Sequence, residues 1–362
     1  MPNAANGDVV MGFFELLEER ECLLADGATG TNYFKRGLGS GDPPELWNVD
    51  HPDRVRDLHR EFIEAGADIV LTNTFGGNSY RLMLHNAQDR VFELNKAAAE
   101  NARAEADAVD REVLVAGSMG PTGEIFAPVG TLTIEEGREA FARQAEALKA
   151  GGADLLWIET ISGQEELEAA TQGAATAGLP VVTTMSFDTN GCTMMGVTPE
   201  GFAGLAAGLA HPPVAIGANC GTGAAELVAT VLGITQADPN VLVVAKANCG
   251  VPAFVDGEIE YSGTPELMQD YVRLARNAGA RLIGGCCGTT PAHLKAMREA
   301  LDAYTPGPRP AIAEIETLLG EVSALAKGNA PSAADSSSPR RRGRGRRTRG
   351  GDSHSPLEAA GA

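Results

Sequence analysis

The chain alternates between short apolar runs and longer segments in which apolar residues recur at helical spacing. The apolar runs end in Gly, Asn, Asp or Thr, whereas the longer segments are rich in Ala, Leu, Glu and Arg. The runs predict eight strands, at residues 22–25, 69–72, 114–117, 155–158, 181–186, 214–218, 241–245 and 282–284. The segments predict eight helices, at residues 52–65, 87–109, 134–150, 165–177, 199–209, 224–232, 265–278 and 291–303.

Alternating β and α units of this length predict a (β/α)8 barrel, the TIM barrel. Right-handed crossover connections of this kind build a closed parallel sheet that is surrounded by helices. We expect one barrel domain at residues 13–326 and a tail at residues 327–362. A doubly wound open sheet is the structural alternative, because it is built from the same βαβ unit.

Polar and reactive residues follow the predicted strands. A barrel builds its active site from the loops at the C-terminal ends of its strands, so residues at these positions are expected to face one rim. In chain order they are Asp26, Gly27, Ala28 and Thr29 after the first strand, Asn73 and Phe75 after the second, Glu159 after the fourth, Asn219 and Cys220 after the sixth, Cys249 after the seventh, and Cys286 and Cys287 after the eighth.

The adjacent residues Cys286 and Cys287 lie between glycines. A disulfide between neighbouring residues strains the peptide that joins them, so a metal explains the pair more simply than a bond between the two sulfurs. Strands six and eight are near neighbours around a barrel, which lets Cys220 join the pair. Three thiolates with one open position are the pattern of a catalytic zinc site. The alternative is that both cysteines are small buried apolar residues.

Composition and charge distinguish an acidic main part of the chain from a basic C-terminal tail. The chain has 362 residues, 43% of them hydrophobic, and a formal net charge of −19. From Ser332 onward, seven arginines oppose three acidic residues, a net charge of +4 that leaves −23 on the rest. This tail lacks the apolar residues needed for a core, so we expect it to be disordered. It is either a solubilising or partner-docking segment or a segment that contacts nucleic acid through charge.

The N-terminal sequence lacks the basic start and apolar run of a secretory signal, and no apolar run is long enough to span a bilayer. We therefore expect a cytoplasmic protein that does not bind a membrane. In that compartment thiols stay reduced, so clustered cysteines indicate metal binding or catalysis.

The motifs together resemble the zinc-dependent homocysteine S-methyltransferases, a family that includes betaine-homocysteine methyltransferase and the homocysteine-binding module of cobalamin-dependent methionine synthase. The resemblance covers about residues 16–298, and the combination of an Asn-Cys loop with a Gly-Gly-Cys-Cys-Gly-Thr loop is its most specific part. The matching segments are 26–31, 61–68, 72–75, 120–123, 159–160, 217–220 and 284–289.

The resemblance implies a zinc ion bound by Cys220, Cys286 and Cys287, which would activate the thiol of L-homocysteine for methylation to methionine. It implies that Asp26 and Glu159 bind the amino group of homocysteine. The backbone of Gly27, Ala28 and Thr29 would receive its carboxylate, with Asn73 and Asn219 as further contacts. Three alternatives stay open: Asp26 as a turn or helix cap, Glu159 as a structural ion pair, and Cys249 as a fourth ligand instead of a bystander.

The sequence indicates the methyl donor less clearly than it indicates homocysteine and zinc. Betaine or a related onium compound needs aromatic rings around its cation. Trp47 lies in a stretch where the betaine enzymes place such a ring, and Tyr33, Phe34 and Phe75 are further candidates. Gly76, Gly77 and Asn78 follow Phe75, where those enzymes carry another aromatic residue. The segments 72–75 and 247–254 are more similar to the module of methionine synthase, which implies a methylated corrinoid protein as the alternative donor.

Two other functions remain as alternatives to a methyltransferase for homocysteine. One is a barrel enzyme that methylates a different thiol or a selenol, although Asp26 and Glu159 favour an acceptor with an amino group. The other is a zinc-binding or RNA-binding protein without catalytic activity. The sequence leaves the oligomeric state open, including a homo-oligomer.

Overall fold

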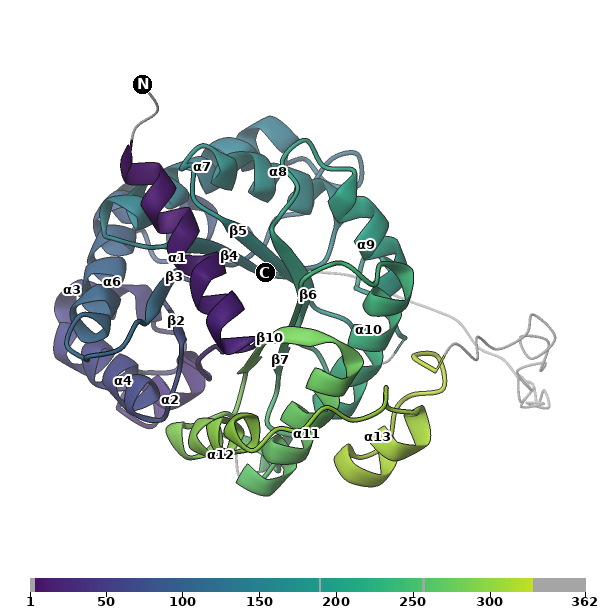
Figure 1. Cartoon of the computed structure of the whole chain (residues 1–362). Coiled ribbons are helices and arrows are strands. Elements are labelled where there is room, and N and C mark those ends of the chain that lie inside the picture. Colours follow the sequence, from purple (N-terminus) through teal and green to yellow (C-terminus); the bar gives the residue numbers. More distant parts are fainter. Residues whose placement is uncertain (1–3, 189, 256–257, 328–362) are drawn as a thin grey trace, which may run out of the picture. The chain divides into compact units, whose positions relative to one another are not determined.

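A computed structural model describes residues 4–188, 190–255 and 258–327 as a (β/α)8 barrel (Figure 1). Its parallel sheet has the order β1-β10-β7-β6-β5-β4-β3-β2. An isolated parallel bridge between Ala25 and Ile69 joins β1 to β2 and closes the barrel. The strands are β1 (Leu23–Leu24), β2 (Ile69–Leu71), β3 (Leu114–Met119), β4 (Leu155–Ile161), β5 (Val181–Met185), β6 (Ala215–Cys220), β7 (Val243–Ala247) and β10 (Ala280–Gly285).

Helices surround the sheet, as the spacing of apolar residues predicts. Four of them begin with a proline directly after the capping position, where a missing N–H costs nothing, and α7 begins with a capping box between Thr133 and Glu136. The main barrel helices are α4 (Pro52–Glu64), α6 (Val91–Ala106), α7 (Ile134–Ala150), α8 (Gln164–Ala175), α9 (Pro199–Ala207), α10 (Ala224–Ala237), α11 (Pro265–Ala278) and α12 (Pro291–Asp302).

Short elements lie in the loops that follow the first two barrel strands. They are α2 (Gly30–Phe34), the 3-10 turn η1 (Pro44–Leu46), α3 (Trp47–Asp50), α5 (Ser79–Met83) and the 3-10 turn η2 (Gln88–Arg90). These loops belong to the C-terminal end of the barrel, so they lie at the rim where an active site is expected.

Helix α1 (Ala4–Arg20) is an element that the apolar pattern did not predict. It crosses in front of the strands in Figure 1 and packs against β1 and β4. Its residues Phe13, Leu16 and Leu17 are buried in one cluster with residues of the barrel interior, including Trp157. Because Arg20 directly precedes β1, α1 covers the N-terminal end of the barrel and leaves the C-terminal end to the loops.

Three more features depart from the sequence-based expectation. Strand β7 begins and ends two residues later than expected, which places Lys246 inside the strand and Asn248 directly after it. An antiparallel hairpin of β8 (Pro252–Val255) and β9 (Glu258–Tyr261) occupies the loop after β7. Helix α13 (Ile312–Leu319) packs on α10 and α11.

The expected tail, residues 327–362, lies outside the described residues apart from Lys327. Within the described part of the chain, no helix is both long and apolar enough to cross a bilayer.

Candidate metal and substrate site

Three cysteines meet at the C-terminal end of the barrel. The sulfurs of Cys220, Cys286 and Cys287 all lie within 4.8 Å of one another, although β6 and β10 are separated in sequence by β7. The last residue of β7 and the residue that follows it hold the pair in place. The Cys286 N–H donates to the Ala247 carbonyl over 2.6 Å, and the Cys287 N–H donates to Oδ1 of Asn248 over 3.1 Å.

The three thiols raise one another's pKa values, whereas a bound metal ion would stabilise them as thiolates. Hydrogen bonding to Cys286 lowers the pKa of Cys220, but Cys287 and burial outweigh it and raise this pKa to about 11. The hydrogen bond with Cys220 raises the pKa of Cys286 to about 12, to which burial also contributes. Zn–S bonds of about 2.3 Å put the sulfurs of a tetrahedral site about 3.8 Å apart, which their mutual separations allow. The donor set therefore fits a thiophilic dication that compensates the charge of three thiolates.

Asn219 connects this cluster to the end of β4. Its Oδ1 accepts hydrogen bonds from the Thr160 N–H (2.8 Å) and the Thr184 hydroxyl (2.7 Å), and its Nδ2 donates to Thr160 Oγ1 over 2.7 Å. Nδ2 also lies 3.9 Å from the sulfur of Cys286. Thr160 and Cys220 both adopt left-handed backbone angles, with φ of 65° and 61°. Such strain in a β-branched residue persists only when its surroundings hold it, and Asn219 supplies that support.

Glu159 precedes Thr160 and is buried in the barrel interior. Its Oε1 accepts a hydrogen bond of 2.5 Å from the hydroxyl of Ser118 on β3. Burial raises the pKa of its carboxyl group, whereas the positive charge of Lys246 opposes this rise. Glu159 thus provides a desolvated negative charge beside the thiols, at the position that the sequence predicts for binding an amino group.

Asp26 has a partner that the sequence interpretation missed. Lys246 on β7 donates to Oδ1 of Asp26 over 3.0 Å, with both side chains at most 3% exposed, and the Leu71 N–H donates to Oδ2 over 2.8 Å. Burial alone would lower the pKa of Lys246, but Asp26 and Glu159 outweigh it and raise that pKa. A lysine in the apolar run Val243–Ala247 indicates a buried charge that needs a carboxylate, so the sequence did contain this information.

The loop of Gly27, Ala28 and Thr29 lies against the cysteine loop. The Ala28 N–H donates to the hydroxyl of Thr289 over 3.0 Å. A Cβ atom on Gly27 would approach Phe62 and Thr289 to 2.8 Å, so only glycine allows this close packing. Thr29 precedes α2 and its carbonyl accepts from the Tyr33 N–H. The predicted backbone site for a carboxylate is therefore beside Cys286 and Cys287.

Two residues of the predicted set have structural partners. Asn73 donates to the Pro44 carbonyl over 2.7 Å and to Asn48 over 3.1 Å. Trp47 is only 7% exposed, packs against Tyr33, and has the guanidinium of Arg54 at 4.9 Å from its ring centroid.

Phe75, by contrast, is 39% exposed at the end of β2. The structure therefore places Trp47 in the core and Phe75 at the surface. Among the ring contacts of the described residues, none joins Trp47 to Phe75.

Cys249 lies close to the cluster without joining it. Its N–H donates to the Cys287 carbonyl over 2.9 Å, but among the described residues its thiol is not part of the group of sulfurs that could share a metal. Its side chain is buried, and burial raises its pKa to about 11. The geometry gives Cys249 a packing role beneath the loop.

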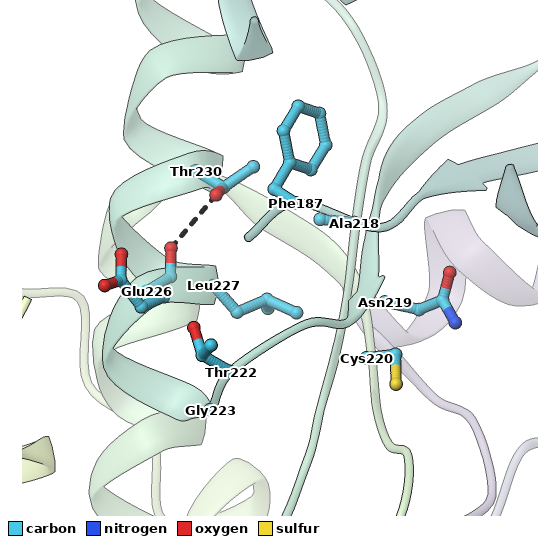
Figure 2. A pocket seen from close by; sticks show the side chains of 9 residues that line it. All are labelled: Phe187, Ala218, Asn219, Cys220, Thr222, Gly223, Glu226, Leu227 and Thr230. Atoms are coloured by element: carbon cyan, nitrogen blue, oxygen red, sulfur yellow. Dashed lines mark hydrogen bonds between the residues drawn. The ribbon is translucent and has the colours of Figure 1, made fainter. Parts of the chain in front are cut away.

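The space on the helix side of Cys220 is too small for a substrate. Figure 2 shows this space between β6 and α10, with Leu227 and Thr222 near the helix and the Asn219 side chain pointing away from it. Its volume of about 10 Å³ is at the lower limit for one water molecule. Within the described part of the chain, the helix side of Cys220 therefore has no room for a substrate thiol, so we expect the thiol to approach from the interior and rim of the barrel, where Glu159 lies.

Comparison with known proteins agrees with this geometry. Residues 23–301 match the family described as homocysteine S-methyltransferase. The chain is 32% identical to methionine synthase of Mycobacterium tuberculosis over 303 residues, which are 79% of this chain and 25% of that protein. It is also 32% identical to methionine synthase of Mycobacterium leprae over 312 residues, which are 82% of this chain and 26% of that protein. The chain thus spans about a quarter of the length of these relatives.

Solved structures give the same result. The homocysteine methyltransferase MmuM from Escherichia coli, in its oxidised form, superposes with a TM-score of 0.67 at 27% identity over 80% of this chain and 99% of that one. Its metallated form superposes with a TM-score of 0.63 at 28% identity, with the same coverage. The chain belongs to the homocysteine S-methyltransferase family.

Proposed function

We propose that this protein is a zinc-dependent methyltransferase that converts homocysteine to methionine. The observation that carries the proposal is the convergence of Cys220, Cys286 and Cys287 beside the buried carboxylate of Glu159. The thiols supply a metal site, and the carboxylate supplies a partner for an amino group. A substrate that needs both is an amino acid with a thiol.

The three thiolates would hold the metal, and the metallated form of the E. coli relative supports this part. Zinc bound there would supply the positive charge that lets a fourth thiol, that of the substrate, lose its proton at neutral pH. Asn219 and Asn248 would keep the sulfur atoms in position through their contacts with Cys286 Sγ and the Cys287 N–H.

Glu159 is the carboxylate that we assign to the substrate ammonium. Asp26 was predicted to share this task, but its two oxygens already accept from Lys246 and from the Leu71 N–H. Lys246 neutralises Asp26, so one negative charge remains for one ammonium group. The N–H groups of Gly27 and Thr29 would receive the substrate carboxylate, because the Ala28 N–H already donates to Thr289.

In the methyl transfer, the deprotonated sulfur of homocysteine attacks the methyl carbon of the donor. The new S–C bond forms while the bond from this carbon to the donor breaks, and the donor keeps that electron pair. The thiol proton has by then passed to solvent. The site would hold the sulfur in one orientation toward the methyl carbon.

Betaine or a related onium compound is the first candidate donor. Its proposed site uses Trp47 and Phe75, of which Phe75 is exposed. Arg54 lies over the Trp47 ring, so that face already has a cation and cannot take a second. An onium donor would depend mainly on Phe75 and its surroundings.

A methylated corrinoid protein is the second candidate donor, and the surface of the barrel mouth favours it. Large apolar side chains are exposed on the segments that follow β1, β2, β3, β5 and β7, including Val129 at 75% and Met194 at 84% exposure. Apolar side chains around an active-site opening suit a macromolecular partner better than a small polar donor. We call these the rim residues: Phe34, Phe75, Ile125, Val129, Met194, Met195 and Val251.

The test is methionine formation by the zinc-loaded full chain from homocysteine, with betaine, S-methylmethionine or a methylated corrinoid protein as donor. Turnover with either onium compound supports the first candidate, and turnover only with the corrinoid protein supports the second. The Cys286→Ala variant should lose both bound zinc and activity, because two thiolates hold zinc much more weakly than three. Full zinc content in that variant, or no homocysteine binding by the parent protein, would contradict the proposal.

A further inference from the structure

Tyr261, on the β8–β9 hairpin, lies against the cysteine loop, and the chemistry derived above gives it no role. It is the last residue of β9 and packs, partly buried, against the hydrophobic core. A Cβ atom on Gly288 would lie only 2.3 Å from Cγ of Tyr261, and Gly288 has a φ of 80°. Glycine therefore lets the tyrosine ring lie directly over the residue that follows Cys287.

The backbone holds the end of this hairpin in position. Gly263 lies two residues after Tyr261, and its N–H donates to the Cys249 carbonyl over 3.0 Å. The Cys249 N–H in turn donates to the Cys287 carbonyl over 2.9 Å. These two hydrogen bonds and the contact with Gly288 fix the tyrosine ring relative to the cysteine loop.

The hydroxyl of Tyr261 reaches the sulfur of Cys287. A hydrogen bond with Cys220 lowers the pKa of Cys287, but Cys286 and burial outweigh it and raise this pKa to about 12. The hydrogen bond from Tyr261 also acts to lower it. Burial, followed by the negative charge of Cys287, raises the pKa of Tyr261 itself, so the phenol keeps its proton and serves a thiolate as a donor.

Each of the three sulfurs thus has one neutral side chain as a hydrogen-bonding neighbour. A side-chain hydrogen bond links Asn248 to Cys220, and Nδ2 of Asn219 lies 3.9 Å from the sulfur of Cys286. Tyr261 has the same relation to the third sulfur. Three thiolates carry three negative charges, of which a divalent ion balances two. Hydrogen-bond donors beside the ligands stabilise the charge that remains.

We propose that Tyr261 is a positioning residue of the metal site, whose hydroxyl donates to the thiolate of Cys287 when a metal ion is bound. Metal binding must displace a proton from this thiol, so a donor that stabilises the thiolate favours binding at neutral pH. The donor also withdraws electron density from the sulfur, which leaves more positive charge on the metal for the thiol of homocysteine. The inference rests on the metal site of the proposed function and adds a residue that the hairpin supplies.

The experiment is cobalt(II) binding by the full chain, in which cobalt replaces zinc and reports on its sulfur ligands through sulfur-to-cobalt charge-transfer absorption. Tyr261→Phe keeps the ring over Gly288 and removes only the hydroxyl. The variant should bind cobalt and zinc about tenfold more weakly in competition with a chelator. Its charge-transfer band should move to longer wavelength, because the sulfur of Cys287 loses the donor that lowers the energy of its electrons.

Tyr304→Phe is the matched control, because it removes the same hydroxyl group at another place. The Tyr304 hydroxyl donates to Oδ1 of Asn277 over 2.8 Å, and Tyr304 follows the C-terminal end of α12, away from the thiols. This control should keep both the metal affinity and the absorption spectrum of the parent protein.

An unchanged charge-transfer band in Tyr261→Phe would overturn the inference, whatever the stability of the variant, because Tyr261 would then only pack on Gly288. The proposed function would survive that result, since it depends on the three thiols and not on the tyrosine. Absence of cobalt and zinc binding by the parent protein would overturn both.

Discussion

Lys246 determines what the two buried acids of the barrel interior can do. It forms the ion pair with Asp26, its charge acts on Glu159, and its ammonium lies 5.5 Å from the centroid of the Trp157 ring. A buried cluster with two carboxylates and one ammonium group needs one more positive charge to be neutral. We assign that charge to the ammonium group of the proposed amino-acid substrate.

Glu159→Gln should raise the dissociation constant of homocysteine about tenfold or more, because a charged partner of the ammonium becomes neutral. Zinc content should stay the same, since Glu159 is not a ligand. Calorimetric titration with homocysteine and metal analysis measure the two effects. Ser118→Ala serves as a milder companion, which removes only the hydrogen bond to Oε1. An unchanged homocysteine affinity in Glu159→Gln would refute the assigned role.

Lys246→Met should destabilise the fold by about 3–5 kcal/mol near neutral pH, because Asp26 then lacks its buried counter-charge. Burial already raises the pKa of Asp26 above its usual value, and without Lys246 this pKa should rise further. The folded state then keeps a proton that the unfolded state releases. Stability is therefore greatest below the unfolded pKa and falls as the pH rises toward the folded pKa.

Urea unfolding of Lys246→Met from about pH 5 to about pH 8 should show this fall more steeply than the parent protein does. Lys295→Met, at an exposed position on α12, is the control and should follow the parent protein. A flat pH profile in Lys246→Met would mean that Asp26 has found another partner.

The sequence identifies the thiols more readily than their surroundings. Adjacent cysteines between glycines, at the ends of predicted strands, indicate where the sulfurs meet. The partner of Asp26 depends on the exact start of β7, which was predicted two residues too early. Trp47 could likewise be singled out from the sequence. Its burial and its contact with Arg54 could not, because they arise from packing between loops that no local sequence pattern describes.

Helix α1 covers the N-terminal end of the barrel. Phe13 and Phe14 are consecutive residues on it, yet Phe13 is fully buried and Phe14 is 42% exposed. The helix therefore stabilises the barrel through one of its faces, and that face lies at the opposite end from the thiols.

Phe13→Ala should lower the free energy of unfolding by about 3–5 kcal/mol, because it leaves a cavity between α1 and the barrel interior. Phe14→Ala is a control with the same chemical change at the neighbouring position and should cost far less. Urea denaturation measures both. Homocysteine affinity of the folded Phe13→Ala protein should be unchanged, and a large loss of affinity would show that α1 also shapes the substrate site.

The elements that the sequence predicts best are those with local markers. Prolines at the first turns of α4, α9, α11 and α12 fix where these helices begin, and the predicted starts agree with the structure. Helix α1 lacks such a marker. The β8–β9 hairpin was missed although Asp256-Gly257, a common hairpin dipeptide, lies between its two runs in the sequence.

For the molecule as a whole, the two ends of the barrel differ in chemistry. The thiols, Glu159 and the rim residues belong to the C-terminal end, whereas Arg20, Arg111 and Arg298 surround the buried carboxylate of Asp68 at the N-terminal end. A large donor would approach the thiols across the rim residues.

Met194→Asp together with Val129→Asp should slow methyl transfer from a corrinoid protein about tenfold or more, because charges replace apolar contacts at the mouth. Phe14→Asp is the control, since Phe14 is 42% exposed but lies on α1, at the N-terminal end of the barrel. The measurement is the methylation rate at limiting corrinoid protein. If only small donors support turnover, and the double variant uses them normally, the rim residues have no role in delivery.

The position of the cysteines in the chain has a consequence for protein synthesis. Cys220 leaves the ribosome well before Cys286 and Cys287, and β1, the first strand made, pairs with β10, the last. A growing chain that ends before residue 280 has one of the three sulfurs and lacks β10, so its sheet is open. The metal site and the closed barrel therefore become complete late in synthesis and at nearly the same time. Truncated translation products have neither.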